Sequence, residues 1–400
     1  MRHYVARQPI FDQNQEVFAY ELLYRSALYN GYSNEDGGRA TTEVITNSLL
    51  LIGLDTLTRG KKAFINFTGN LLENEVATLL PAGLAVIEIL EDSEPDEKVL
   101  EVCKKLKKMG YQLALDDFVY EQKFAPLIEL ADIIKVDFKV TGAAERKAVI
   151  NRLGKNKKFL AEKVETREEF TQALEIGYSY FQGYFFSKPI IVSGKDVPGN
   201  KLIYLQLLQD LHSQEFDFEQ IESLFKRDVS LSYQLLKYIN SASFSFRSEI
   251  NSIKQALVML GQKEISKWLS LVALKGIGED KPDELFVTSI CRAIFCELIA
   301  PKVGLSHSRS DLFLLGMFSL IDAFLDQPLS GILTGLPISM EIKKALLGEQ
   351  SLFKDVYNLV LFYERGDWEN FHEISVKLGL DEAEVIRFYI DSLEIVNQIF

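Results

Sequence analysis

The stretch LALDDF, residues 113–118, is an apolar run that ends in two adjacent acids, Asp116 and Asp117. An aspartate that follows a strand is often only a cap, because its side-chain oxygen accepts a hydrogen bond from a free backbone N–H of the next helix or turn. The pair indicates a site only if other strands carry polar residues at the same end. The runs on either side of it decide between these two interpretations.

Short apolar runs alternate with amphipathic stretches from the start of the chain to about residue 190. Near-continuous apolar strands that alternate with helices are typical of a parallel sheet covered on both faces. Gly110 and Gly177 stand where two predicted helices, 96–110 and 166–177, should end. Seven runs, or eight with residues 4–11, favour a closed α/β barrel of the TIM type over an open sheet. The seven runs are residues 16–24, 62–67, 84–90, 111–117, 131–138, 157–163 and 178–186.

The pattern changes after about residue 195. Residues 190–200, IIVSGKDVPGN, contain the Gly, Pro, Ser and Asn residues that are typical of a linker. The rest of the chain has almost entirely helical periodicity, with apolar residues three and four positions apart. We therefore predict a barrel domain over residues 1–194 and an all-α domain over residues 195–400.

Composition narrows the class of protein. The net charge of -13 over 400 residues argues against a partner such as a DNA or RNA polymer, which would need a basic surface. The three cysteines do not have the spacing of a metal site, and an odd number favours a reducing compartment. The start of the chain does not resemble a secretory signal, and no apolar run reaches the roughly 20 residues that cross a bilayer. We expect a cytoplasmic protein without a membrane partner.

Polar residues interrupt consecutive runs of the first half near the same end. In a βα barrel the chemistry lies at the C-terminal ends of the strands. A buried charge costs several kcal/mol unless it is paired or bound to a metal, so seven such interruptions indicate a site rather than chance. These residues are Glu21 and Arg25, Asn66, Glu88 and Glu91, Asp116 and Asp117, Lys135 and Asp137, Glu162 and Glu165, and Gln182 with Gly183.

The residue types at these positions predict a chemistry. Carboxylates with one amide oxygen suit hard cations such as Mg²⁺, Mn²⁺ or Ca²⁺, and the first half has one histidine, His3, outside the runs, which argues against zinc. Two divalent ions about 4 Å apart can activate a water and stabilise the leaving oxygen of a phosphodiester. Lys135 could be a solvent-exposed lysine, but its apolar neighbours favour an inward side chain that orients the water or offsets phosphate charge.

These motifs in this order resemble a known family over about residues 1–190. Glu21-Leu22-Leu23 with Arg25, Asn66, EILE (88–91), LALDDF, KVD (135–137), AEKVE (161–165) and FQGYFF (181–186) closely resemble the EAL-domain cyclic di-GMP phosphodiesterases. The resemblance implies a modified TIM barrel with one antiparallel strand. It also implies hydrolysis of cyclic di-GMP to the linear dinucleotide with Mg²⁺ or Mn²⁺.

The resemblance also implies roles for individual residues. Metal-associated positions would be Glu21, Asn66, Glu88, Asp116, Asp117 and Glu162. Catalytic roles would belong to Lys135 and Glu162, with Glu91 steadying the loop after the aspartate pair. Substrate contacts would come from Gln8, Arg25, Asp137, Glu165 and Gln182, the last also supporting the metal shell.

Two departures from the family pattern keep alternative functions open. The signature reads Glu-Leu-Leu instead of Glu-Ala-Leu, which retains the glutamate. Residues 119–124 read VYEQKF where active members usually have Gly-Thr-Gly-Tyr-Ser-Ser, a loop that positions metals and couples dimerisation to turnover. The chain is therefore expected to be either a phosphodiesterase or a cyclic di-GMP receptor without turnover. A pure scaffold has the least support, because orphan buried charges are costly.

The second half resembles the HDOD domain over residues 227–271, and YERGDW (363–368) fits the same combined family. The whole arrangement resembles bacterial EAL–HDOD signalling proteins. Catalysis by this half is not expected, because an HD hydrolase needs a His-Asp pair and none of its histidines, His212, His307 and His372, precedes an aspartate. The resemblance implies a regulatory module that binds a protein partner, and a homodimer through the barrel. SASFSF (241–246) is either an aromatic contact surface or, as we favour, ordinary packing.

Overall fold

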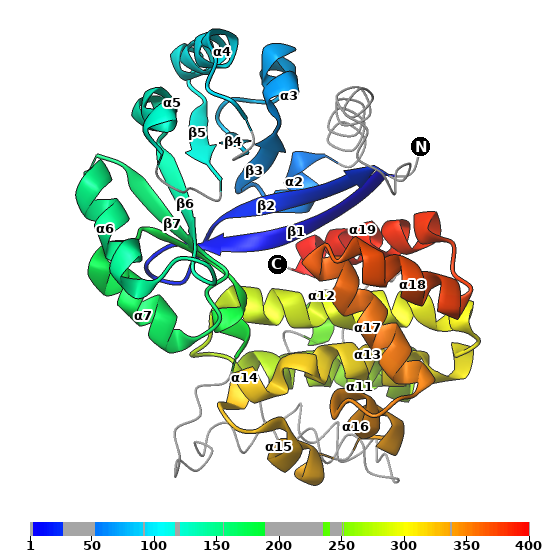
Figure 1. The fold of residues 1–400 in the computed structure, drawn as a ribbon. Coiled ribbons are helices and arrows are strands. Elements are labelled where there is room, and N and C mark those ends of the chain that lie inside the picture. The colour runs from blue at the N-terminus through cyan, green and yellow to red at the C-terminus, as the bar shows by residue number, and fades with distance from the viewer. Residues whose placement is uncertain are drawn as a thin grey trace.

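The computed structural model describes residues 3–26, 53–90, 93–116, 121–154, 156–188, 235–240, 250, 252–336 and 338–399. Its first half is a closed barrel of eight strands, and its described second half is helical, as Figure 1 shows. Both features confirm the predicted fold class. The predicted linker at 190–200, the domain boundary at 194/195 and the SASFSF segment lie outside the described residues, so they stay predictions.

The strands follow one another around the barrel in chain order. β1 is antiparallel to both of its neighbours, β2 and β8, and every other adjacent pair is parallel, which confirms the single reversed strand. The strands are β1 (His3–Phe11), β2 (Val17–Ser26), β3 (Lys62–Phe67), β4 (Ala85–Ile89), β5 (Gln112–Leu115), β6 (Ile133–Asp137), β7 (Lys158–Glu162) and β8 (Tyr180–Gln182). The prediction of a strand over 178–186 was too long, because the chain turns at Gly183 into the 3₁₀ helix η3 (Tyr184–Ser187).

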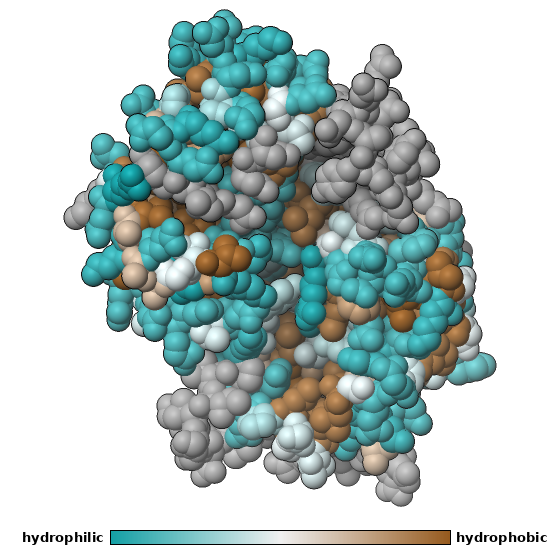
Figure 2. Space-filling model, viewed as in Figure 1, coloured by the Kyte–Doolittle hydropathy of each residue, from teal (hydrophilic) through white to brown (hydrophobic). Residues whose placement is uncertain are grey.

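Helices cover the outside of the barrel. In α4 the side chain of Asp96 caps the N-terminus by accepting a hydrogen bond from Val99 N at 2.8 Å, and residues 99, 103 and 106 form its buried stripe. The other faces of these helices are hydrophilic, as the upper part of Figure 2 shows. The helices are α2 (Leu54–Thr58), α3 (Gly69–Glu73), η1 (Val76–Leu79), α4 (Glu97–Lys108), η2 (Gln122–Phe124), α5 (Ala125–Leu130), α6 (Ala143–Leu153) and α7 (Arg167–Ile176).

The second half is a helical bundle built around α12. Its helices are α11 (Ile253–Ile277), α12 (Asp283–Ile299), η4 (Ala300–Val303), η5 (Ser306–Ser308), α13 (Arg309–Met317), η6 (Phe318–Leu320), α14 (Ile321–Leu325), α15 (Leu329–Gly335), α16 (Met340–Leu346), α17 (Leu352–Arg365), α18 (Trp368–Leu378) and α19 (Glu382–Ile399). Among the described helices, none alone is long and apolar enough to span a membrane. The segments Ser306–Leu325 and Leu329–Gly335 meet the length and composition requirements only together, and they are bent by 117°.

The two halves share one continuous hydrophobic core. The β1–β2 hairpin lies against α12, α17 and α19, as Figure 1 shows. Polar contacts also join the halves: Tyr20 of β2 donates its hydroxyl hydrogen to the buried Glu284 Oε2 at 2.8 Å, and Asn397 Nδ2 donates to Thr56 O in α2 at 3.0 Å. The helical half therefore packs directly on the strands that begin the barrel.

Gly183 is required by the close approach of the backbone segments that follow β7 and β8. Its φ of 140° lies in the region that favours glycine, and a Cβ atom would lie 2.2 Å from Val164 O. We expect Gly183→Ala to lower the free energy of unfolding by about 2–4 kcal/mol. Gly154→Ala is the matched control: its φ is also positive, at 83°, but nothing lies within 4 Å of the added carbon. Urea unfolding of both variants measures the difference, and equal losses would contradict the prediction.

Candidate functional site

The interior of the barrel is built in layers. One layer contains one apolar, inward-facing side chain from each strand: Ile10, Ala19, Phe64, Val86, Ala114, Ile133, Leu160 and the half-buried Tyr180. Side chains alternate across a strand, so the residue two positions nearer the C-terminal end of each parallel strand faces inward one level higher. Because β1 runs in the opposite direction, its inward-facing residue at this higher level is the one two positions earlier in the sequence. The next layer therefore consists of Gln8, Glu21, Asn66, Glu88, Asp116, Lys135, Glu162 and Gln182.

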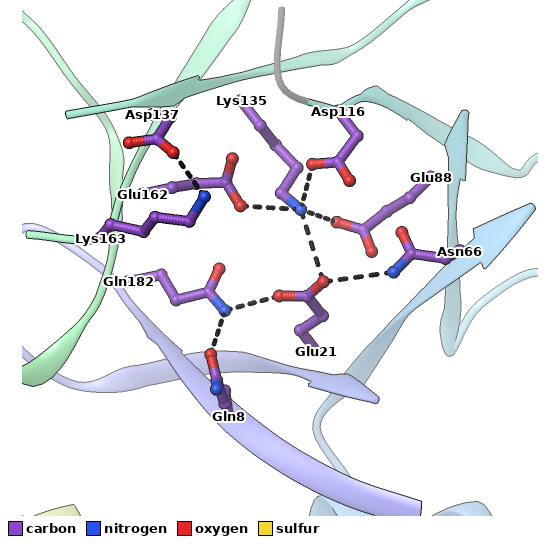
Figure 3. A network of polar contacts seen from close by, with 10 residues as sticks. All are labelled: Gln8, Glu21, Asn66, Glu88, Asp116, Lys135, Asp137, Glu162, Lys163 and Gln182. Atoms are coloured by element: carbon purple, nitrogen blue, oxygen red, sulfur yellow. Dashed lines mark hydrogen bonds and ion pairs between the residues drawn. The ribbon is translucent and has the colours of Figure 1, made fainter. Parts of the chain in front are cut away.

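The ammonium group of Lys135 lies at the centre of this polar layer, as Figure 3 shows. Its Nζ atom lies 2.7 Å from Glu88 Oε1, 2.6 Å from Asp116 Oδ1, 2.9 Å from Glu162 Oε1 and 3.6 Å from Glu21 Oε1. The Lys135 side chain is 1% exposed and that of Glu88 is 0% exposed. The structure thus confirms the inward orientation of Lys135 and brings four of the predicted carboxylates together.

Amide side chains complete the layer around Glu21. Asn66 Nδ2 donates to Glu21 Oε1 at 3.4 Å, and Gln182 Nε2 donates to Glu21 Oε2 at 2.6 Å. Gln182 Nε2 also donates to Gln8 Oε1 at 3.1 Å, which links β8 to β1 across the point where the barrel closes (Figure 3). Gln8 and Gln182 therefore belong to the same network as the carboxylates.

The layer carries more negative than positive charge. Four carboxylates face one lysine. Burial raises the pKa of Glu88, and this effect is larger than the lowering effect of the Lys135 charge. Burial likewise raises the pKa of Glu162 to about 8, and the charges of Asp116 and Glu21 add to it. Burial lowers the pKa of Lys135, but the surrounding carboxylates raise it further, to well above its ordinary value. The lysine is therefore held charged, while the carboxylates remain short of positive charge.

The donor set fits divalent cations. Within the described residues, no three acidic, histidine or cysteine side chains are already arranged around a metal position, because Lys135 lies where the carboxylates converge. Five buried oxygens of this layer nevertheless have no hydrogen-bond partner there, and Lys135 forms an ion pair with one of them, Glu88 Oε1. The other four are Asn66 Oδ1, Glu88 Oε2, Glu162 Oε2 and Gln182 Oε1. Unpartnered hard oxygens and an excess of negative charge are both satisfied by bound divalent cations.

Two other predicted residues lie apart from this network. Asp137 accepts a hydrogen bond from Lys139 N at 2.6 Å. It also pairs with Lys163, as Figure 3 shows. Burial raises the pKa of Asp137, but these partners lower it below its ordinary value. Glu165 lies at the surface, with Oε1 2.6 Å from Lys139 Nζ. Their roles as substrate contacts stay predictions.

Some predicted positions lie outside the described residues. These are Glu91, Asp117, residues 119–120 of the altered loop and the side chain of Arg25. The rest of that loop, residues 121–124, leads through η2 into α5.

Sequence reasoning missed the contribution of the helical half to this region. Gln8 Nε2 donates to the backbone oxygen of Arg365, at the C-terminal end of α17, at 3.5 Å. The Arg365 guanidinium carbon lies 5.3 Å from the ring centre of Tyr184 in η3. The only sequence signal for this contact was the YERGDW motif, and nothing in its spacing connects it to β1.

Comparison with known proteins identifies both halves. The EAL domain model matches residues 3–189, and the HDOD domain model matches residues 198–325. The uncharacterized protein YuxH of Bacillus subtilis is 40% identical over 98% of this chain and 98% of its own length. The chain belongs to the EAL–HDOD family. The Vibrio cholerae protein named cyclic di-GMP phosphodiesterase CdgJ is 35% identical over 97% of this EAL–HDOD chain and 91% of its own length.

Two solved structures are similar to part of this chain. Klebsiella pneumoniae BlrP1, solved as a calcium and cyclic di-GMP complex, has a TM-score of 0.40 and 25% identity, covering 47% of this chain and 56% of that chain. The Bacillus subtilis YkuI protein, with an EAL domain in complex with cyclic di-GMP and calcium, has a TM-score of 0.39 and 19% identity, covering 61% and 70%.

Proposed function

We propose that the EAL domain binds cyclic di-GMP together with two divalent cations, Mg²⁺ or Mn²⁺, and hydrolyses one of its phosphodiester bonds. The observation that carries this proposal is the polar layer in which four carboxylates from four strands share one lysine. Such a layer is costly to bury without additional cations. The name of CdgJ, which is similar over nearly the full length of both chains, supports the same substrate.

The residues have distinct tasks in this proposal. The cations would be held by Glu21, Asn66, Glu88, Asp116 and Glu162, with Asp117 from outside the described residues. When bound, they would polarise the phosphodiester and activate the attacking water. The Lys135 ammonium can hold the carboxylates in place and face the phosphate charge. Without bound cations, burial raises the pKa of Glu162 to about 8. Its unpartnered Oε2 is available to a cation, and a bound cation would hold the carboxylate ionised.

The HDOD domain is proposed to be a regulatory module rather than a second catalytic centre. Of its histidines in the described part of the chain, His307 is exposed, and His372 is exposed with Nδ1 2.6 Å from Glu382 Oε1. This pattern supports the interpretation of these histidines as surface residues. A protein partner for this domain, homodimerisation through the barrel and a cytoplasmic location complete the proposal.

A second candidate function is that of a receptor that binds cyclic di-GMP without cleaving it. The observation that favours it is the sequence VYEQKF at residues 119–124, which replaces the glycine-containing loop of active members. A loop that closes over a site often sets the rate of turnover. Under this alternative the polar layer would still bind cations and the dinucleotide.

One experiment separates these functions. The purified full chain is incubated with cyclic di-GMP and Mg²⁺ or Mn²⁺, and the products are separated by chromatography. Calorimetry with Ca²⁺ is run in parallel, with chromatography to verify that the dinucleotide is still cyclic. Linear product that is absent with Glu21→Ala is the expected result. Heat of binding without product would establish the receptor. If neither product nor heat of binding is observed, both functions are overturned.

A further inference from the structure

The YERGDW motif forms the contact between the end of α17 and the barrel. Tyr363 donates its hydroxyl hydrogen to Val5 O in β1 at 3.0 Å, and its side chain is fully buried. Residues 3–9 of β1 pair with β2 on one side, whereas β8 pairs with β1 only at Ile10 and Phe11. The remaining edge of β1 is thus available to a partner, and α17 supplies a hydrogen-bond donor to it.

The neighbouring residues of the motif hold the end of α17 in place. Glu364 forms a buried ion pair with Arg292 of α12, with Oε2 2.8 Å from Nη2 and 2.9 Å from Nε. Gly366 ends the helix with a φ of 67°, and a Cβ atom there would lie 2.8 Å from Leu23 Cδ1 in β2. The ring of Trp368 lies 5.4 Å from that of Tyr4. The end of α17 is therefore fixed both to the helical half and to β1 and β2.

A chain of hydrogen bonds leads from this helix end into the polar layer. The backbone oxygen of Arg365, in the last turn of α17, accepts from Gln8 Nε2. With its nitrogen directed to Arg365, Gln8 presents Oε1 to Gln182 Nε2, which in turn donates to Glu21 Oε2. If the Gln8 amide were rotated by 180°, its Oε1 would face the Arg365 carbonyl oxygen, which is also an acceptor, and its Nε2 would face Gln182 Nε2, which is also a donor. A cavity of about 60 Å³ between the halves is lined by Gln8 and Gln182, together with Arg292 and Glu364.

We propose that the C-terminal end of α17 is the element through which the helical half sets the affinity of the barrel for cyclic di-GMP, by orienting Gln8. This inference rests on the proposed function of the site. Tyr363 and Gly366 are positioning residues: they place the Arg365 carbonyl, and the carbonyl selects the amide orientation of Gln8 that supports Gln182 and Glu21. Any change in the packing of α17 then changes the dinucleotide site.

The test compares two glycines that end helices in the same way. Gly366→Ala would push the end of α17 away from Leu23, whereas Gly379→Ala places a side chain at nearly the same φ, 66°, at the end of α18, with nothing within 4 Å. The dissociation constant of cyclic di-GMP is measured by calorimetry with Ca²⁺ on the full chain. We expect about a tenfold increase for Gly366→Ala and less than a twofold change for Gly379→Ala. Tyr363→Phe, which removes only the hydroxyl group, is the second variant if Gly366→Ala does not fold.

A double-variant comparison identifies the route of the effect. In a Gln8→Met background the amide is absent, so Gly366→Ala is expected to cause no further loss of affinity. A loss that persists in this background would mean that α17 acts on the barrel by general destabilisation, and it would overturn the inference. An unchanged affinity of both Gly366→Ala and Tyr363→Phe would also overturn it, while leaving the proposed function intact.

Hydrogen exchange of the ligand-free chain separates this inference from the proposed function. Peptides covering β1 are expected to exchange faster in Gly366→Ala than in Gly379→Ala or the unmodified chain. If the unmodified chain does not bind cyclic di-GMP, the proposed function fails and the exchange result decides whether α17 controls β1. Unchanged β1 exchange in that case would overturn the inference as well.

Discussion

Lys135→Met is expected to lower the free energy of unfolding of the ion-free protein by about 3–5 kcal/mol. The substitution keeps most of the side-chain volume but removes the positive charge that four buried or half-buried carboxylates share. Like charges at short distance in a buried layer repel one another when no cation is present. The measurement is the midpoint of urea unfolding in the presence of a chelator.

Lys139→Met is the control for this prediction. Its ammonium pairs with Glu165 at 2.6 Å, but its side chain is 58% exposed, so the loss should not exceed about 1 kcal/mol. Addition of Mg²⁺ or Mn²⁺ should restore more stability to Lys135→Met than to the unmodified protein, because the cations supply the missing charge. Equal losses for the two lysines would show that the layer does not depend on Lys135.

Glu88→Gln is expected to have opposite effects on function and stability. Glu88 is fully buried, and its Oε2 has no partner within the described residues. The substitution therefore removes a buried charge that we propose binds a cation. We expect binding or turnover of cyclic di-GMP to fall at least about 100-fold. The ion-free protein should gain about 1–2 kcal/mol of stability, because one of four mutually repelling charges is lost.

The two effects are measured separately on the same preparation. Calorimetry and product chromatography report function, and urea unfolding with a chelator reports stability. Glu175→Gln is the matched control, because Glu175 is exposed on α7 and should leave both quantities unchanged. A loss of stability in ion-free Glu88→Gln would contradict the view that the layer carries excess negative charge.

All seven predicted strands, and the eighth that residues 4–11 offered, exist in the structure, because their apolar runs are local signals. Residues 62–67 were predicted without error, and most other ends differ from the structure by one or two residues. The run at 178–186 was longer than β8, because apolar content alone does not reveal that the backbone at Gly183, with a φ of 140°, turns into η3. The residue at which such a strand ends therefore depends on the tertiary structure around it and not on its own apolar content.

Most members of the polar layer could also be predicted, because strand period and barrel topology together place residues of neighbouring strands at one level; Gln8 was expected only from the family resemblance. What could not be predicted is how the charges are distributed within it. Asp137 and Lys135 are two positions apart on β6, yet Lys135 joins the carboxylates while Asp137 pairs with Lys163. Which partner a charged side chain selects depends on distances of a few ångströms, and these are set by the packing of several strands.

By itself the sequence predicted a barrel of seven or eight strands, a helical second half and a set of oxygen-bearing side chains near one end of the strands, because periodicity and residue type act over a few neighbouring positions. Only the tertiary structure decided that one lysine bridges four carboxylates and that α17 contacts β1. Tyr363 and Val5 are separated by 358 residues, so no local pattern encodes their contact. That contact exists because a shared hydrophobic core brings the two halves together.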